Sequence, residues 1–225
     1  KPLNVKEWIS CLAQIIFTLI TYQKSFAFTH NDLHTNNIMF NKTDKEFIVY
    51  KYDNKYYKVP TYGKLFKIID FGRAIYKYKN NIICSDSFHE DGDAATQYNF
   101  EPFFNKNKPR LEPNPSFDLC RLACSLIEHI VSDFKDFKNL SKTEVEYKKL
   151  IYSWTLDDKN KNILYKSNGD ERYEDFNLYI KITKNVNNHI PSQEIKNNFF
   201  DTLIMKDINN INYNIIDIDN MKELF

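Results

Sequence analysis

A compact, mostly polar cluster at residues 30–37 constrains the fold more than any other feature of the sequence. It follows a segment, 6–24, in which apolar residues recur at three- and four-residue spacing, as on the buried face of a helix. An apolar triplet at residues 38–40 follows the cluster and predicts a short strand. The cluster therefore lies on a loop between a buried helix and a strand, where such residues favour chemistry over packing. Its members are His30, Asn31, Asp32, Leu33, His34, Thr35, Asn36 and Asn37.

A second motif ends a later predicted strand. Aromatic and β-branched runs at 47–50 and 56–59 are separated by Asp53-Asn54, a good hairpin turn. A further strand is predicted at 65–69 and leads directly into Asp70-Phe71-Gly72. The two motifs thus flank predicted β structure.

Together the motifs resemble the protein-kinase catalytic loop, H-x-D-L-x-x-x-N, and its D-F-G magnesium motif. Their order, the strand between them and Asp118 in a later apolar helix resemble the family's C-terminal lobe over residues 6–135. The H-x-D-L-H form of the loop is similar to that of haspin and of the aminoglycoside and choline kinases. Segments 58–64 and 117–121 look like those of serine/threonine kinases from large DNA viruses.

The resemblance implies an α+β, mainly α fold, the kinase C-terminal lobe with a small β-hairpin layer. We treat residues 1–225 as one such lobe, with a core at 6–135 and a divergent helical part at 136–225. The glycine-rich loop, the β3 lysine and the αC glutamate of the family's N-terminal lobe are not recognisable. We therefore expect an ATP-binding lobe upstream, and poor nucleotide binding without it.

The resemblance also implies the catalytic roles. Asp32 would accept the proton of the substrate hydroxyl, while Asn37 and Asp70 would ligate Mg²⁺ that bridges the phosphates of ATP. Carboxylate and amide oxygens suit that ion. His34 stands where typical protein kinases have a lysine and could donate to the transferred phosphate. In isolation, each Asp or Asn could instead cap a loop.

Other residues are expected to support the site. The family uses the histidine at position 30 as a scaffold beneath the D-F-G backbone, so His30 is expected to pack there. Phe71 would be a core anchor beside Gly72. Asp118 would accept hydrogen bonds from the backbone of the 30–37 loop, with a helix N-cap as the alternative.

Two apolar residues are candidates for the nucleotide pocket. Met39 aligns with the floor under adenine, and Ile69 with the residue before D-F-G that lines the same pocket. Both could equally be ordinary core residues. Asn31 replaces the arginine that many kinases pair with a phosphorylated activation loop, so we predict no dependence on such phosphorylation.

The expected function is phosphotransfer from ATP to Ser or Thr of a protein substrate. One alternative is a non-catalytic pseudokinase or scaffold; Asp32, Asn37 and Asp70 are all retained, which favours catalysis. The other is a small-molecule kinase of the aminoglycoside or choline kinase type, but Asp70-Phe71-Gly72 favours a protein substrate.

Composition bounds the partners and the compartment. The formal charge is +1 and no long run of one sign occurs, so we expect neither nucleic acid nor membrane as a partner. The apolar run at 11–20 is short for a bilayer span. The four cysteines lack C-x-x-C spacing, which favours buried thiols over disulfides or a zinc site. Reduced thiols fit an intracellular, cytoplasmic protein, in the cytoplasm of a host cell or in a virion.

The rest of the chain is predicted to be largely helical. A buried helix is expected at 117–132, and Ser141 with Glu144 forms a capping-box pattern that predicts a helix through Trp154. Helical spacing recurs at 173–188 and 192–206. Segments 73–116 and 157–171 lack periodicity and predict loops, and 207–219 predicts a loop or fraying tail.

Overall fold

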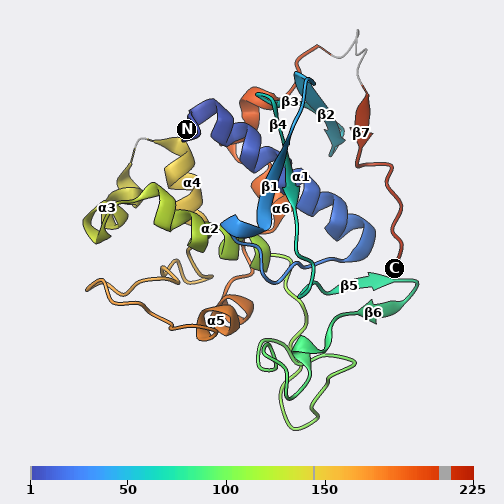
Figure 1. The fold of residues 1–225 in the computed structure, drawn as a ribbon, viewed down its shortest axis with the longest axis vertical. Helices are drawn as coiled ribbons and strands as arrows, with labels where there is room; N and C mark the ends of the chain where they lie inside the picture. The colour runs from blue at the N-terminus through green and yellow to red at the C-terminus, as the bar shows by residue number, and fades with distance from the viewer. Residues whose placement is uncertain (1, 144, 208–213) are drawn as a thin grey trace.

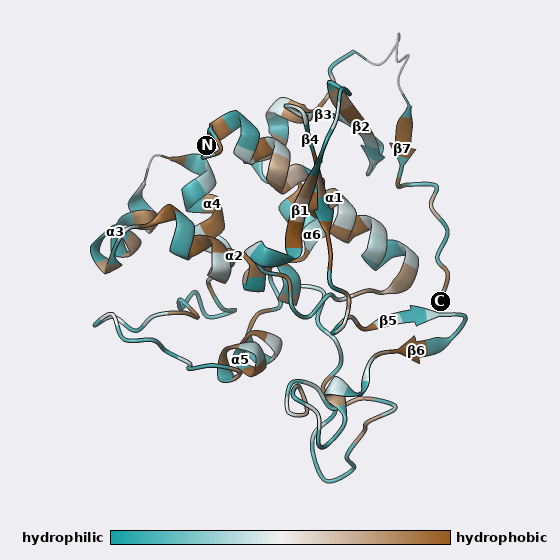
Figure 2. Ribbon diagram, viewed as in Figure 1, coloured by the Kyte–Doolittle hydropathy of each residue, from teal (hydrophilic) through white to brown (hydrophobic). Residues whose placement is uncertain are grey.

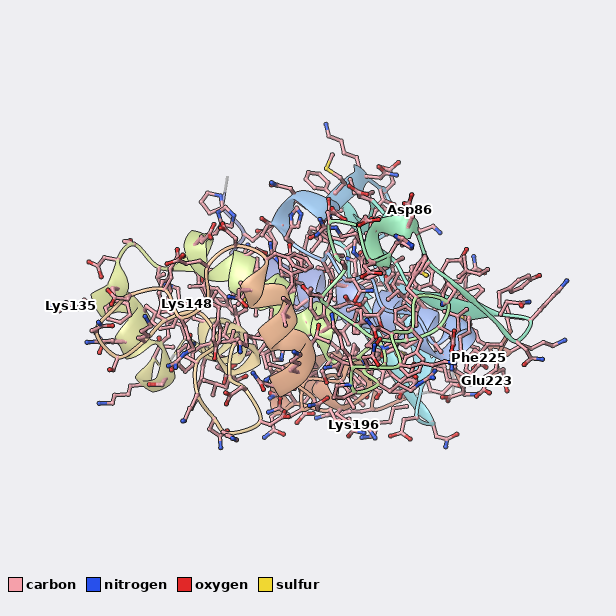
Figure 3. The ribbon with its side chains drawn as sticks, turned by 90° about the horizontal axis from the view of Figure 1, so that it is seen from below. Asp86, Lys135, Lys148, Lys196, Glu223 and Phe225 are labelled. Carbon is pink, nitrogen blue, oxygen red and sulfur yellow. The ribbon has the colours of Figure 1, made fainter. Side chains whose placement is uncertain are left out.

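The computed structural model describes residues 2–143, 145–207 and 214–225. Helix α1 (Val5–Phe26) crosses the middle of the molecule, and the remaining helices and strands are arranged around it (Figure 1). The structure is 36% helical and 18% strand, so helix predominates over strand. Figure 3 shows the ribbon from below, with Lys135 and Lys148 toward one end and Phe225 toward the other.

Helix α1 begins and ends at well-defined caps. Asn4 and Glu7 form a capping box, in which each side chain accepts a hydrogen bond of 3.0 Å from the other residue's backbone N–H. At the other end, Ala27 adopts a left-handed conformation and its N–H donates to the carbonyl of Gln23. The helix therefore extends the predicted segment 6–24 slightly at both ends.

Helix α1 is long and apolar enough to pass as a candidate membrane span. However, 56% of its most apolar window is buried inside the structure, where Leu12, Ile16 and Leu19 are completely buried. A core helix meets the same length and composition criteria, so this finding does not assign the chain to a membrane.

A second buried helix, α2 (Phe117–Ile130), matches the predicted segment 117–132. All of its residues are buried except Arg121, Glu128 and His129. Helix α4 (Glu146–Trp154) packs against α2 and places Trp154 in the core, where its indole N–H donates to Glu194 at 2.8 Å. These helices and α1 share the main hydrophobic core.

Strands β1 (Ile38–Lys42) and β4 (Lys64–Ile68) form an antiparallel pair that lies across α1 (Figure 1). The register pairs Ile38 with Ile68. Buried Gln14 of α1 ties the pair to the helix, because its side chain accepts from the N–H of Phe66 at 3.0 Å and donates to the carbonyl of Lys64 at 3.2 Å. The ribbon is thereby fixed on the core.

Strands β2 (Phe47–Tyr52) and β3 (Lys55–Pro60) form the predicted hairpin. Asp53 and Asn54 have φ values of 53° and 56°, as a two-residue turn of this type requires. Strand β7 (Ile215–Asp217) adds to β2 in parallel, so the part of the predicted 207–219 tail that the structure describes is not simply a loop. The carboxylate of Asp219 accepts from the N–H groups of both turn residues, which holds this segment against the hairpin.

The segment 73–116 is largely irregular, as predicted, but contains a short strand pair that the sequence did not reveal. Strands β5 (Tyr76–Tyr78) and β6 (Asn81–Ile83) pair in an antiparallel ribbon, followed by the 3₁₀ turn η2 (Asp86–Phe88). A small apolar cluster then supports the segment, with Phe88, Tyr98 and Phe100 as its aromatic members. The segment is folded on its own local core.

The predicted capping box at Ser141 is wrong. Glu144 lies outside the described residues, and Ser141 belongs to the 3₁₀ turn η3 (Leu140–Lys142), while α4 begins only at Glu146. An earlier helix, α3 (Phe134–Asn139), begins where the side chain of Asp133 accepts from the N–H of Asp136 at 2.8 Å. Ser141 therefore lies inside a 3₁₀ turn between α3 and α4 and caps neither helix.

The last two predicted helices are shorter than their patterns. Helix α5 (Asn177–Asn185) occupies the middle of 173–188. The segment 192–206 holds only part of α6 (Pro191–Glu194) and the 3₁₀ turn η4 (Asn198–Leu203). The side chain of Asn197 accepts from the N–H of Phe199 and starts this new turn, which divides the predicted helix.

All four cysteines are free, as predicted, but Cys84 is only partly buried rather than buried. Cys11, Cys120 and Cys124 are buried, and burial raises the pKa of Cys11 to about 12. A buried thiol with so high a pKa is unreactive at neutral pH.

Candidate functional site

The 30–37 loop leaves helix α1 and returns to the fold as strand β1. Thr29 forms a two-hydrogen-bond bridge with Ile75, which fixes the start of the loop, and the 3₁₀ turn η1 (Thr35–Asn37) ends it. The β1–β4 register then brings Asn37 beside Ile69, whose N–H donates to the carbonyl of Asn37 at 3.0 Å. Pairing of the two strands therefore places the loop next to Asp70, 33 positions later in the sequence.

Asp118 holds the loop from below. Its side chain is completely buried, and its two carboxylate oxygens accept from the backbone N–H groups of His30 at 2.8 Å and Asn31 at 3.0 Å. Burial raises the pKa of Asp118, while the charge of His30 and these two hydrogen bonds act to lower it. The contact joins helix α2 to the loop, as the family resemblance led us to expect.

His30 links the loop to the strand end before Asp70. Its Nε2 donates to the carbonyl of Ile69 at 2.9 Å, and its Nδ1 accepts from the N–H of Asp32 at 3.3 Å. A ring with its proton on Nε2 satisfies both contacts. His30 is completely buried, so its position beneath this backbone is that of a support rather than of a group open to a substrate.

Asn37 connects the two acidic residues of the site. Its side-chain Nδ2 donates to the backbone carbonyl of Asp32 at 2.9 Å and lies 3.3 Å from Nε2 of His34. The backbone carbonyl of Asn37 accepts from the N–H of Ile69, the neighbour of Asp70. Because Nδ2 is directed at the loop, the amide oxygen is the atom of this side chain that remains available as a ligand.

Asp70 is exposed and has a left-handed backbone, with φ of 62°. Such a conformation in a residue other than glycine is uncommon and often occurs at functional sites. Its Oδ1 lies 3.4 Å from the N–H of Gly72, and a Cβ added to Gly72 would meet the same oxygen at 3.3 Å. Glycine at position 72 therefore leaves room for the carboxylate.

The polar groups of the site fit Mg²⁺. One carboxylate and one amide oxygen are hard oxygen ligands, and protein Mg²⁺ sites commonly use one or two carboxylates together with substrate phosphates and water. Among the described residues, no group of three or more His, Cys, Asp or Glu side chains could hold a metal. Asp70 and Asn37 are the residues of this site that would hold such an ion.

His34 faces both acidic residues. Its Nε2 lies 3.9 Å from Oδ2 of Asp32, and the charges of Asp32 and Asp70 both act on its ring. Burial nevertheless dominates and lowers the pKa of His34, with the charges of Arg121 and His30 acting in the same direction. At neutral pH His34 is thus a neutral hydrogen-bonding group rather than a substitute for a lysine cation.

The predicted nucleotide residues lie on an open apolar face. Met39 is 56% exposed and Ile69 38%, so neither is an ordinary core residue. Phe40 and Phe71 are also exposed, and Figure 2 shows β1 as largely hydrophobic. The prediction that Phe71 is a core anchor is wrong, since its ring packs on His30 and Phe28 from one side and faces solvent from the other.

Asn31 has a structural role that the sequence did not reveal. It is completely buried, and its Nδ2 donates to the carbonyls of Thr29 at 3.3 Å and Arg73 at 3.1 Å. Its Oδ1 accepts from the hydroxyl of Tyr98 at 2.5 Å and from Gln97 at 3.4 Å. A neutral side chain therefore ties the 73–116 segment to the loop, at the position where the family resemblance led us to note only a missing arginine.

The structure also adds a residue to the site. The hydroxyl of Tyr179, on helix α5, donates to Oδ1 of Asp32 at 2.6 Å. Residues 177–185 show ordinary helical spacing, and nothing in that pattern points to a loop 147 positions earlier.

Comparison with known proteins gives a partial assignment. No family model matches this chain. It is 29% identical over 167 residues to the "Putative serine/threonine-protein kinase" R301 of Acanthamoeba polyphaga mimivirus. The matched region covers 67% of this chain and 41% of the relative. It is 35% identical over 115 residues to a "Probable serine/threonine-protein kinase" of Dictyostelium discoideum, which covers 47% of this chain and 9% of that protein.

The chain is therefore similar to two proteins named as serine/threonine kinases, one of them viral. It spans less than half the length of either relative. These similarities agree with the kinase resemblance of the two motifs at the coarse level of the family.

Proposed function

We propose that this chain is the catalytic lobe of a serine/threonine protein kinase, which transfers the γ-phosphoryl group of ATP to a protein hydroxyl. The β1–β4 pairing is the observation that carries the proposal, because it joins Asn37 to Ile69, the neighbour of Asp70, while the side chain of Asn37 bonds to the backbone of Asp32. The similarity to two proteins named as serine/threonine kinases supports the same interpretation.

In this proposal the side chains of the chain perform three tasks. Asp32 accepts a hydrogen bond from the acceptor hydroxyl and takes its proton as the new oxygen–phosphorus bond forms and the bond to the leaving oxygen of ADP breaks. Asn37 and Asp70 supply oxygen ligands for Mg²⁺, which when bound neutralises charge on the phosphate oxygens. His34 is a neutral hydrogen-bonding group beside them.

The exposed apolar face fits the same proposal. Met39 and Ile69 lie at the strand ends next to Asn37 and Asp70, where an adenine ring would contact them. A longer protein that covers this face with an ATP-binding lobe would shield these side chains from water. We propose that the full activity belongs to such a longer protein.

The test is Mg²⁺-dependent transfer of labelled phosphate from ATP to a generic basic protein. The assay compares residues 1–225, the full natural translation product that contains them, and that product with Asp70→Ala. Asp44→Ala is a matched control, because it removes an exposed carboxylate from the loop after β1.

We expect transfer by the full product, little by residues 1–225, and loss of transfer only in Asp70→Ala. Absence of transfer from the full product to protein would overturn the proposal and favour a scaffold. Transfer to an aminoglycoside or choline, with none to protein, would instead favour a small-molecule kinase.

A further inference from the structure

The hydroxyl of Tyr179 donates a hydrogen bond to the carboxylate of Asp32. The hydrogen bond is short, 2.6 Å, and joins helix α5 to a loop from the other end of the chain. Asp32 is the residue to which we assign the proton of the acceptor hydroxyl. A fixed hydrogen-bond donor on one carboxylate oxygen therefore affects the orientation of the Asp32 side chain.

The core fixes the ring of Tyr179 in place. It stacks on Phe176, with ring centroids 5.2 Å apart, and lies 5.9 Å from the ring of buried Phe117. Helix α5 is anchored one and two turns later by Ile182 and Val186, both completely buried. The Tyr179 ring is thus held in place by the rings of Phe176 and Phe117, and its helix is held by buried residues that follow it.

The far end of α5 is tied to the rest of the fold by a buried amide. Asn114 donates to the carbonyl of Val186 at 2.6 Å and to that of Thr183 at 3.3 Å. Asn114 lies three residues before helix α2, which carries Asp118. The hydrogen bonds that tie down α5 and those that hold the 30–37 loop therefore come from residues close together in the chain.

The environment keeps the tyrosine hydroxyl protonated. Burial raises the pKa of Tyr179, and its hydrogen bond to Asp32 acts in the same direction. The guanidinium group of Arg121 lies 5.0 Å from the ring centroid and opposes this rise. At neutral pH the group is a hydrogen-bond donor.

One oxygen of Asp32 is held while the other is open to an acceptor. Oδ1 receives the hydrogen bond of Tyr179, whereas Oδ2 lies 3.9 Å from Nε2 of His34, beyond hydrogen-bonding distance. The Asp32 side chain is 24% exposed. Among the described residues Oδ2 accepts no hydrogen bond, so it is the oxygen left for an acceptor hydroxyl while Tyr179 stays on Oδ1.

We propose that Tyr179 is a positioning residue that holds Oδ1 of Asp32, so that Oδ2 faces the acceptor hydroxyl; the inference rests on the kinase function proposed above. The competing interpretation is that the Tyr179 hydroxyl blocks the site by occupying the place of the acceptor. The packing of the Tyr179 ring and the second, open oxygen of Asp32 favour positioning. The two interpretations predict opposite effects when the hydroxyl is removed.

The experiment measures steady-state transfer by the full natural product carrying Tyr179→Phe. Loss of the orienting hydrogen bond is expected to lower kcat by about tenfold to a hundredfold, with the KM for ATP unchanged, because the nucleotide ligands are untouched. Tyr173→Phe is the matched control, since it removes a hydroxyl from another ring of the same apolar cluster. The thermal unfolding midpoint of each variant separates loss of activity from loss of fold.

A double-substitution cycle distinguishes positioning from a general structural effect. When Asp32 is already Asn, adding Tyr179→Phe should change the residual rate by less than about twofold, because the carboxylate that Tyr179 aims is gone. An equal loss in both backgrounds would overturn the inference, as would a rate increase in Tyr179→Phe, which would indicate blockage. Full activity of Tyr179→Phe beside an active parent would overturn only this inference, whereas an inactive parent would overturn the proposed function and the inference with it.

Discussion

Substitution of Asp118 by Asn tests the support beneath the 30–37 loop. Asn keeps the shape of the side chain, but only one of its two terminal atoms can accept a hydrogen bond. One of the N–H groups of His30 and Asn31 then faces an NH₂ group and loses its acceptor. Both residues are completely buried, so water cannot replace the lost partner.

The magnitude follows from these two contacts. A hydrogen bond to a charged group contributes about 1.5–3 kcal/mol, and a buried donor left unsatisfied costs about 1–3 kcal/mol. Part of this lost stability is offset, because the substitution also removes a buried charge, whose burial raises the pKa of Asp118. We therefore expect a loss of about 2–3 kcal/mol in the free energy of unfolding.

The assay is urea unfolding at neutral pH, followed by the fluorescence of buried Trp154. With a slope of about 2–3 kcal/mol per M, the midpoint should fall by about 1 M at an unchanged slope. Glu128→Gln is the matched control, because it makes the same chemical change at an exposed position of the same helix and should shift stability by less than about 0.5 kcal/mol. A loss in Asp118→Asn no larger than in this control would refute the reasoning.

Two further predictions concern the same loop. Asn31→Ala should lower the free energy of unfolding by about 2 kcal/mol or more, since it removes the acceptor of the buried Tyr98 hydroxyl and the donor to the carbonyls of Thr29 and Arg73. Limited proteolysis should then cut the 73–116 segment faster, and the same rate in Asn31→Ala as in the exposed-site control Asn36→Ala would contradict this. For His34, an NMR titration of the ring should give a midpoint below 6.5, because burial lowers its pKa. As the pH falls through 6.5, the imidazole of His34 takes up its proton in the unfolded chain before it does so in the folded protein. The free energy of unfolding should therefore fall in this pH range more than it does in His34→Gln. An NMR midpoint above 6.5 would contradict the prediction.

Local patterns predicted the elements whose signals lie within a few residues. The Asp53-Asn54 turn gave the hairpin because both residues tolerate positive φ, and the apolar spacing gave α1 and α2 because each buries a broad face. The capping box at Ser141 failed because Ser141 lies inside the 3₁₀ turn η3, whereas an N-cap residue stands outside the helix that it starts, with an extended backbone.

The site could be predicted in part. Asp32, Asn37 and Asp70 were recognisable because they stand in short motifs of fixed spacing, and the structure brings them together through one strand pair. Phe71 was misjudged, because an aromatic residue in sequence does not show whether a second layer covers it. Tyr179 could not have been found, since its helix carries only an ordinary amphipathic pattern.

The sequence by itself determined the chemistry that the loop can offer and the helices and hairpin that surround it. Tertiary structure decided which distant groups act on that chemistry: Asn31 binds the 73–116 segment, and Tyr179 holds the carboxylate of Asp32. The physical reason is range. Backbone propensity and hydrophobic periodicity act between near neighbours, whereas a hydrogen bond between residues 147 positions apart exists only after the core has packed.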